Sequence, residues 1–256
     1  MSQLIHGVRL ALALSIASAG CNGAPQTESN PRMVHVAAEA PLIDGHAEET
    51  VWAAAEWRAL THAPVGSTPD DAADFSGRYR LLWREDALYL LAEIRDNVLS
   101  DGEPDPLKNY WADDALEILV DEDASGGDHK TSHSAFAYHV ALDGQVVDID
   151  SAGEPILLND HVQAVWRRSQ GAPHLLVWEA RIRLYPDPAT LATGEVWQAR
   201  PLNAGDVIGF ALAWCDSDAP GERSRLMADV DVPPIEGDRN RLYLDAGVFG
   251  RIRLVP

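Results

Sequence analysis

Ten short segments of this chain either alternate apolar and polar residues or run apolar, with turn residues between them. An alternation of period two is typical of strands that bury one face. The predicted strands are Arg78–Trp83, Leu88–Arg95, Ala115–Asp121, Phe136–Leu142, Val146–Ile149, Val162–Arg167, Leu175–Leu184, Val207–Trp214, Leu242–Leu244 and Val248–Leu254. Long helical patterns do not separate them, which argues against βαβ units. We expect an all-β fold, an antiparallel β-sandwich (immunoglobulin-like or jelly-roll-like) with short helical turns, one of them at Glu48–Trp57.

The first residues have the pattern of an export signal. Arg9 supplies a positive charge, and the apolar run Leu10–Ala19 is too short to cross a bilayer. It leads into Ser18-Ala19-Gly20-Cys21, which resembles the lipobox of bacterial lipoproteins, with ordinary cleavage nearby as the alternative. We predict a lipoprotein signal peptide over 1–20, lipidation of Cys21, a flexible tether over 21–38 and one domain over 39–256.

Lipidation would attach an otherwise soluble domain to a membrane surface. Asn22 follows Cys21, so the aspartate that retains many lipoproteins at the inner membrane is missing. We expect an exported protein of the cell envelope, anchored to the outer membrane or located in the periplasm or outside the cell.

The charge of the chain limits its partners. It has 40 acidic and 20 basic side chains, a net charge of −20. Such a surface repels phosphate, which excludes nucleic acid and leaves the lipid as the only expected membrane contact. Of the two cysteines, Cys215 has no disulfide partner if Cys21 is lipidated, and its apolar strand predicts a buried, inert thiol.

Trp111 stands at the end of a long polar loop, followed by Asp113, Asp114 and a strand. An indole beside hydrogen-bonding acids suits a sugar ring, whose C–H face stacks on the aromatic while its hydroxyls bond to polar groups. The alternative is a tryptophan that closes one end of the core. In the strands that follow, Glu117 and His139 point away from the apolar faces and are expected to form a polar floor beneath Trp111, or else a solvated strand face.

Five motifs in order resemble one family. They are Pro41-Leu42-Ile43-Asp44-Gly45 with Trp52, Trp83 with Leu88–Asp96, Trp111-x-x-Asp114-x-x-Glu117-Ile118-x-x-Asp121, Ile208-Gly209-Phe210 with Asp216, and Phe249-Gly250-Arg251-Ile252-Arg253-Leu254. Together they are similar to the family 9 carbohydrate-binding modules, calcium-binding β-sandwiches found on xylanases and in extracellular sugar-binding proteins. The resemblance implies non-catalytic binding of an oligosaccharide or polysaccharide end, with calcium as a structural cofactor.

The resemblance also implies roles for single residues. Trp111 matches the first of two aromatics that clamp a terminal sugar, and Tyr243 takes the place of the second, usually a tryptophan. Glu117 and Asn240 match groups that bond sugar hydroxyls. Two positions depart, since His139 replaces an arginine and Ala213 a glutamine. Because a hydrogen bond contributes roughly 1 kcal/mol, these losses would weaken sugar affinity by a couple of orders of magnitude or redirect it to another glycan.

Acidic loops are the candidate calcium sites. Asp121-Glu122-Asp123-Ala124-Ser125-Gly126-Gly127-Asp128 partly resembles a calcium loop, but Ser132 stands where an EF-hand has its glutamate. We name Asp96, Asp121 and Asp123 as candidate metal ligands, with a solvated acidic hairpin as the alternative.

Other classes have weaker support. Asp113, Asp114 and Glu117 are acids of the type a glycosidase needs, but no nucleophile elbow, zinc motif or phosphate loop is present, so we do not expect an enzyme. The alternatives are a haem-binding electron-transfer sandwich, with Met227 and His139 as axial ligands, and a degenerate module with a structural or assembly role.

Overall fold

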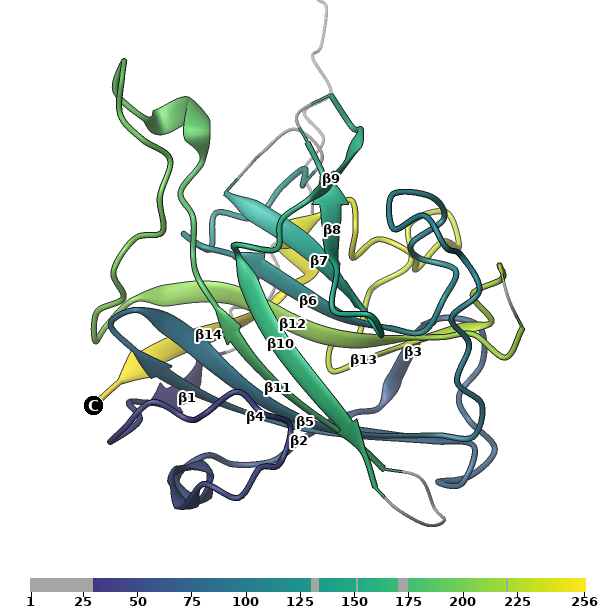
Figure 1. Ribbon diagram of the computed structural model, residues 1–256. Coiled ribbons are helices and arrows are strands. Elements are labelled where there is room, and N and C mark those ends of the chain that lie inside the picture. Colours follow the sequence, from purple (N-terminus) through teal and green to yellow (C-terminus); the bar gives the residue numbers. More distant parts are fainter. Residues whose placement is uncertain (1–29, 130–133, 151, 170–174, 220) are drawn as a thin grey trace, which may run out of the picture.

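Two β-sheets stack face to face in the computed structural model, which describes residues 30–129, 134–150, 152–169, 175–219 and 221–256 (Figure 1). One sheet has nine strands and the other five, and the pairs within them are antiparallel except for β1 with β14. The nine strands are β1 (Arg32–His35), β3 (His62–Val65), β6 (Ala115–Asp121), β7 (Ala135–Ala141), β8 (Val146–Ile149), β9 (Pro155–Leu157), β12 (Val207–Asp216), β13 (Arg225–Ala228) and β14 (Gly250–Val255). The five are β2 (Arg58–Leu60), β4 (Phe75–Arg84), β5 (Ala87–Asp96), β10 (Val162–Arg168) and β11 (Leu175–Ile182). The expected β-sandwich is therefore confirmed.

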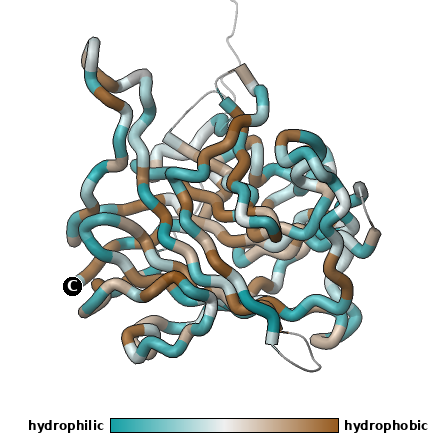
Figure 2. The backbone as a smooth tube through the Cα atoms, viewed as in Figure 1, coloured by the Kyte–Doolittle hydropathy of each residue, from teal (hydrophilic) through white to brown (hydrophobic). Residues whose placement is uncertain are grey.

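The inner faces of the two sheets form the main core. Alternate residues of β6, β7 and β12 face those of β5 and β11, and the hydrophobic segments lie along the strands in Figure 2. Trp178 of β11 meets Trp214 of β12 edge to face across the sheets, with ring centroids 6.2 Å apart. Removing these side chains from water is the main force that holds the sheets together.

A second core covers the outer face of the nine-stranded sheet. Val232, Leu242, Val248 and Phe249, from the segment between β13 and β14, pack on this face. Strand β6 is consequently buried at every position. The outer face of β6 is therefore not solvated, which corrects one of the two sequence interpretations.

The outer face of the five-stranded sheet is covered by the segment that begins with Ile43-Asp44-Gly45. Glu179 is fully buried there and accepts hydrogen bonds from the backbone N–H groups of Asp44 and Gly45 and from Nε1 of Trp52. Gly45 has φ +79°, and a Cβ there would meet the Trp166 backbone at 3.1 Å, so this turn requires glycine. A short 3₁₀ helix, η1 (Thr50–Ala54), confirms the predicted helical turn, and two further ones are η2 (Pro188–Thr190) and η3 (Ala246–Val248).

Two sequence expectations are corrected. Residues 242–244 form a turn, not a strand, in which the Leu244 and Asp245 N–H groups bond to the Arg241 carbonyl. The tether does not extend to residue 38, since β1 pairs with β14 and buries Val34. The signal peptide over 1–20, Cys21 and the first part of the tether lie outside the described residues. Among the described residues, no helix is long and apolar enough to span a membrane.

Candidate functional site

A cavity of about 430 Å³ opens on the outer face of the nine-stranded sheet, at β7 and β8. Its walls include Tyr110, Trp111, His139, Arg223, Asn240 and Tyr243, with His129 and Asp148 deeper in the wall. This size suits a small ligand, and the combination of aromatic surface with a few polar groups is typical of ligand pockets.

Trp111 and Tyr243 reach this cavity from loops far apart in the sequence. Trp111 is 44% exposed and Tyr243 37% exposed, so neither is a core residue. The alternative that Trp111 closes the core is therefore wrong. Tyr110 packs edge-on against Trp111 and also against His139, with ring centroids 5.1 Å and 4.9 Å apart. Tyr110 thus contacts both side chains and links Trp111 to His139.

The acids beside Trp111 hold its loop in place. Asp113 accepts hydrogen bonds from the N–H groups of Gly102 and Glu103, and Asp114 from those of Ser100 and Ser217. Both carboxylates are buried. Each of their four oxygens accepts a hydrogen bond from a backbone N–H group, so the acids that follow Trp111 have a structural role in the loop.

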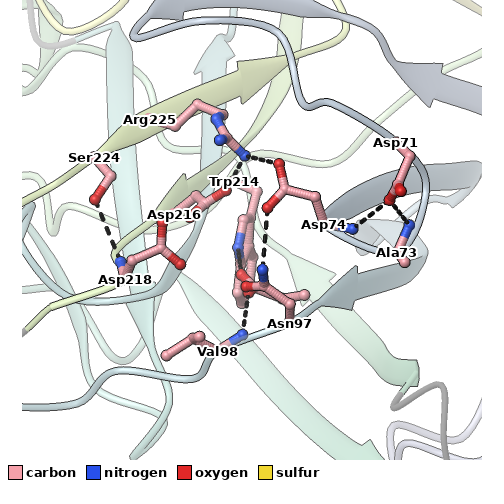
Figure 3. A network of polar contacts seen from close by, with 11 residues as sticks. Asp71, Ala73, Asp74, Asn97, Val98, Trp214, Asp216, Asp218, Ser224 and Arg225 are labelled. Atoms are coloured by element: carbon pink, nitrogen blue, oxygen red, sulfur yellow. Dashed lines mark hydrogen bonds and ion pairs between the residues drawn. The ribbon is translucent and has the colours of Figure 1, made fainter.

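A network of buried acids extends this anchor to the ends of β5 and β12. Asp96 accepts a hydrogen bond from Nε1 of Trp214, and Arg225 bridges Asp74 and Asp216 (Figure 3). Burial, together with the negative charge of neighbouring acids, raises the pKa of Asp96 to about 7 and that of Asp114 to about 8. A proton on these groups reduces their mutual repulsion at the base of the loop.

Glu117 and His139 lie on the outward face of β6 and β7, as their strand periodicity predicted, and the register of the two strands pairs them. His139 lines the cavity, whereas Glu117 is 1% exposed and lies behind the wall. Ala213 pairs with Glu117 on the other side and shares this face. Both positions where the chain departs from the family pattern therefore flank Glu117.

Arg223 is one of the site residues that sequence reasoning missed, together with His129 and Asp148. It comes from the turn between β12 and β13 and enters the cavity wall, where its guanidinium contacts Asn240 Oδ1 at 3.3 Å and Cys215 Sγ at 3.7 Å. Burial acts to lower the pKa of Arg223, but negative charge on Glu117, and on Cys215 when its thiol is ionised, outweighs this effect and raises the pKa. Residues in turns do not follow the alternation that assigns strand residues to a face. The sequence therefore gives no indication that Arg223 enters this cavity.

His129 holds the position of Tyr243. Its Nδ1 lies 3.1 Å from the Tyr243 carbonyl and its Nε2 lies 3.5 Å from Asp148. The backbone of 127–129 also pairs with 244–246. The acidic loop that follows β6 is thus joined directly to the segment that carries Tyr243.

The three candidate metal ligands lie in two places. Asp121 and Asp123 adjoin at one end of β6, and Asp123 contributes to raising the pKa of Asp121 to about 6, after burial. Asp96 is beside Asp114 at the other end, with its oxygens bonded to Trp214 and Val98. The three residues therefore cannot share one ion. Asp121 Oδ1 is buried and has no hydrogen-bond partner among the described residues, which fits a cation at Asp121 and Asp123.

The haem alternative fails on geometry. Met227 pairs with Trp214 and packs in the core between the sheets, whereas His139 lies on the outer face. One haem iron cannot be bound from opposite faces of a sheet, so these residues are not its axial ligands.

The two-sheet sandwich is the fold of a carbohydrate-binding module. The sequence model of the family described as carbohydrate family 9 binding domain-like matches residues 43–256, and the chain belongs to this family. Endo-1,4-beta-xylanase A of Thermotoga maritima is 25% identical over 215 residues, which are 84% of this chain but 17% of the xylanase. The xylanase of Thermotoga neapolitana is 24% identical over the same shares. The chain thus spans about a sixth of these relatives.

Solved structures show the same fold. A family 9 module from Caldicellulosiruptor kristjanssonii, in complex with glucose, superposes with a TM-score of 0.58 at 19% identity, covering 87% of this chain and 95% of that one. The module in complex with cellotriose gives a TM-score of 0.55 at 18% identity, covering 88% and 94%. These similarities establish the β-sandwich of the family.

Proposed function

We propose that this protein binds the end of an oligosaccharide or polysaccharide without acting on it. The observation that carries the proposal is that Trp111 and Tyr243, two partly exposed aromatics, line one cavity together with Arg223 and Asn240. A sugar ring would stack on the two aromatic faces while its hydroxyls bond to the polar side chains. Glucose and cellotriose in the related modules support a glucose-type ring as the first ligand to test.

The family has an arginine at the position of His139, and this chain lacks its guanidinium donors there. Arg223 supplies such donors from another part of the cavity wall. Its guanidinium has five N–H donors, and it lies against Asn240, which was expected to bond hydroxyls. Glu117, behind the wall, provides the negative charge that attracts Arg223. In this arrangement His139 and Asn240 contact the sugar and Glu117 orients Arg223.

The acids at the site favour binding over catalysis. Asp113 and Asp114 bond to backbone N–H groups, and Glu117 is covered. A glycosidase needs two carboxylates that both reach the sugar. The xylanase activity of the relatives is a property of proteins about five times as long as this chain and is not proposed for it.

Calcium at Asp121 and Asp123 would fix the loop that pairs with the segment carrying Tyr243. A calcium ion would bind Asp121 Oδ1, which has no hydrogen-bond partner among the described residues, and would reduce the repulsion between Asp121 and Asp123. Its role would be structural, since it lies at the end of β6 away from the loop of Trp111.

We further propose that the protein is exported and anchored by a lipid on Cys21. The lipobox-like sequence supports this, as does the acidic composition. Metabolic labelling with a palmitate analogue should label the wild type and leave Cys21→Ser unlabelled.

The proposed function is tested by calorimetric titration of the purified protein with glucose, cellobiose and xylobiose in calcium-containing buffer. Saturable heat with at least one sugar is expected. No heat with any of these sugars or with longer glucans and xylans would contradict the proposal and favour a module that serves assembly.

Replacing Arg223 by glutamine is expected to weaken sugar binding by about 10- to 100-fold, because charged hydrogen bonds contribute about 1.5–3 kcal/mol. Arg239→Gln is the matched control, because Arg239 forms an exposed ion pair with Asp231. Unchanged affinity in Arg223→Gln would show that Arg223 does not contact the sugar.

Calcium removal is expected to lower both the melting temperature and the sugar affinity, because the loop of Asp121 supports Tyr243. Asp121→Asn should make both quantities insensitive to chelator. Asp70→Asn, in an exposed loop, is the control. A chelator response that survives in Asp121→Asn would place the ion elsewhere.

A further inference from the structure

Glu117, His139 and Cys215 form a compact cluster beneath the sugar cavity. One ligand atom from each lies within 4.8 Å of the others, and all three residues are buried. Glu117 Oε1 is 3.7 Å from His139 Nε2, and Glu117 Oε2 is 3.7 Å from Cys215 Sγ. A tetrahedral zinc ion, with bonds of about 2.0–2.3 Å, holds its ligand atoms roughly 3.3–3.8 Å apart. Small side-chain shifts would therefore complete the geometry.

The hydrogen bonding of His139 leaves one nitrogen for a ligand. Its Nδ1 lies 3.1 Å from the Ala137 carbonyl, which can only accept, so Nδ1 carries the proton. Nε2 has no hydrogen-bond partner among the described residues, although His139 is 5% exposed. If the ring is neutral, the lone pair of Nε2 faces the carboxylate of Glu117. Two acceptors then lie opposite each other with no proton between them, which is unfavourable unless a cation binds there. Histidines that bind metals commonly show this arrangement, with the other N–H donated to a backbone carbonyl.

We propose that Glu117, His139 and Cys215 bind a zinc-class divalent metal ion at the floor of the sugar cavity. The three donors are the imidazole nitrogen, carboxylate oxygen and thiolate sulfur that zinc accepts, and three protein ligands leave its fourth position open. This site is chemically distinct from the calcium site, which has only oxygen donors and lies at the end of β6. It depends on His139, one of the two positions that depart from the family pattern.

Arg223 also borders the cluster and affects its charge. Its guanidinium lies 3.7 Å from Cys215 Sγ. With the thiolate and Glu117 ionised, the three groups sum to one negative charge, so a divalent cation is still attracted. Arg223→Gln removes a positive charge and is expected to tighten metal binding by about tenfold, opposite to its effect on sugar binding.

The test is a titration with Co²⁺, which replaces zinc and reports on its ligands by absorption. The experiment uses a Cys21→Ser chain, in which Cys215 is the single thiol. Binding at Cys215 should produce a thiolate-to-cobalt charge-transfer band in the near ultraviolet, and zinc should displace it. Cys215→Ser should abolish the band, and His139→Gln should weaken metal affinity by about 100-fold or more, whereas the exposed His35→Gln should not change it.

Sugar titration provides the second readout. Cys215 does not line the cavity, so Cys215→Ser should bind sugar as the wild type does. If Cys215→Ser fails to fold, Cys215→Ala replaces it as the variant that should lack the band. The presence or absence of the band in the Cys21→Ser chain then still tests the proposal. Absence of the band at excess Co²⁺ would overturn the proposal.

Discussion

Trp111→Ala is expected to abolish detectable sugar binding while the free energy of unfolding changes by less than about 1 kcal/mol. The indole is 44% exposed and touches Tyr110 at its edge, so its removal opens no cavity in either core. Loss of a central aromatic contact costs binding about 2–4 kcal/mol, roughly 30- to 1000-fold. Calorimetric titration and chemical denaturation of the same preparation measure the two quantities.

A control for this change is Trp57→Ala. Trp57 is partly buried on the outer face of the other sheet, where Arg78 lies 4.0 Å from its ring. Its loss should lower stability and leave sugar affinity unchanged. A collapse of stability in Trp111→Ala, or undiminished binding, would remove Trp111 from the proposed site.

Asp229→Ala is expected to have the largest effect on stability, a loss of about 3–5 kcal/mol. The Asp229 carboxylate pairs with Arg32 of β1, accepts a hydrogen bond from the Tyr79 hydroxyl of β4 and accepts another from the Leu212 N–H of β12. It therefore connects the nine-stranded sheet to the five-stranded one. Burial and the charge of Asp229 raise the pKa of Tyr79 well above its ordinary value, so the phenol remains a donor.

The loss of stability is large because the substitution leaves two polar groups buried without an acceptor. Without Asp229, a mostly buried guanidinium and a fully buried N–H lose their acceptor. Asp231→Ala is the matched control: Asp231 is 61% exposed and pairs with the exposed Arg239, so less than about 1 kcal/mol is expected. Urea denaturation compares the two variants. Equal, small losses would show that the rest of the network compensates for Asp229.

Most of the fold could be predicted because period-two alternation is a local signal. Strands such as Ala115–Asp121 and Val146–Ile149 are observed with the predicted bounds. Strands β2 and β3, of three and four residues, were missed, because so few positions give only a weak alternation, although β8 of the same length was found. The turn at residues 242–244 has the apolar pattern of a strand because Leu242 packs on the outer face of the sheet.

The candidate site could be predicted only where its residues follow a strand or a motif. Glu117 and His139 share a face of adjacent strands, which follows from alternation, whereas the register that pairs them is a finding of the structure. Asp113 and Asp114 follow a motif too, but whether a carboxylate meets a sugar or a backbone N–H depends on how the loop folds.

The amino-acid sequence by itself determined the β-sandwich, the family and the two aromatics of the proposed clamp, because these depend on local periodicity and on motifs of fixed spacing. Only the tertiary structure decided that Arg223 enters the cavity, that Glu117 lies behind its wall, and that His139 and Cys215 meet there. These contacts join β12 and the turn that follows it with β6 and β7, which are far away in the sequence. They form because the segment before β14 covers the outer face of the sheet and buries polar groups that alternation alone would leave in water.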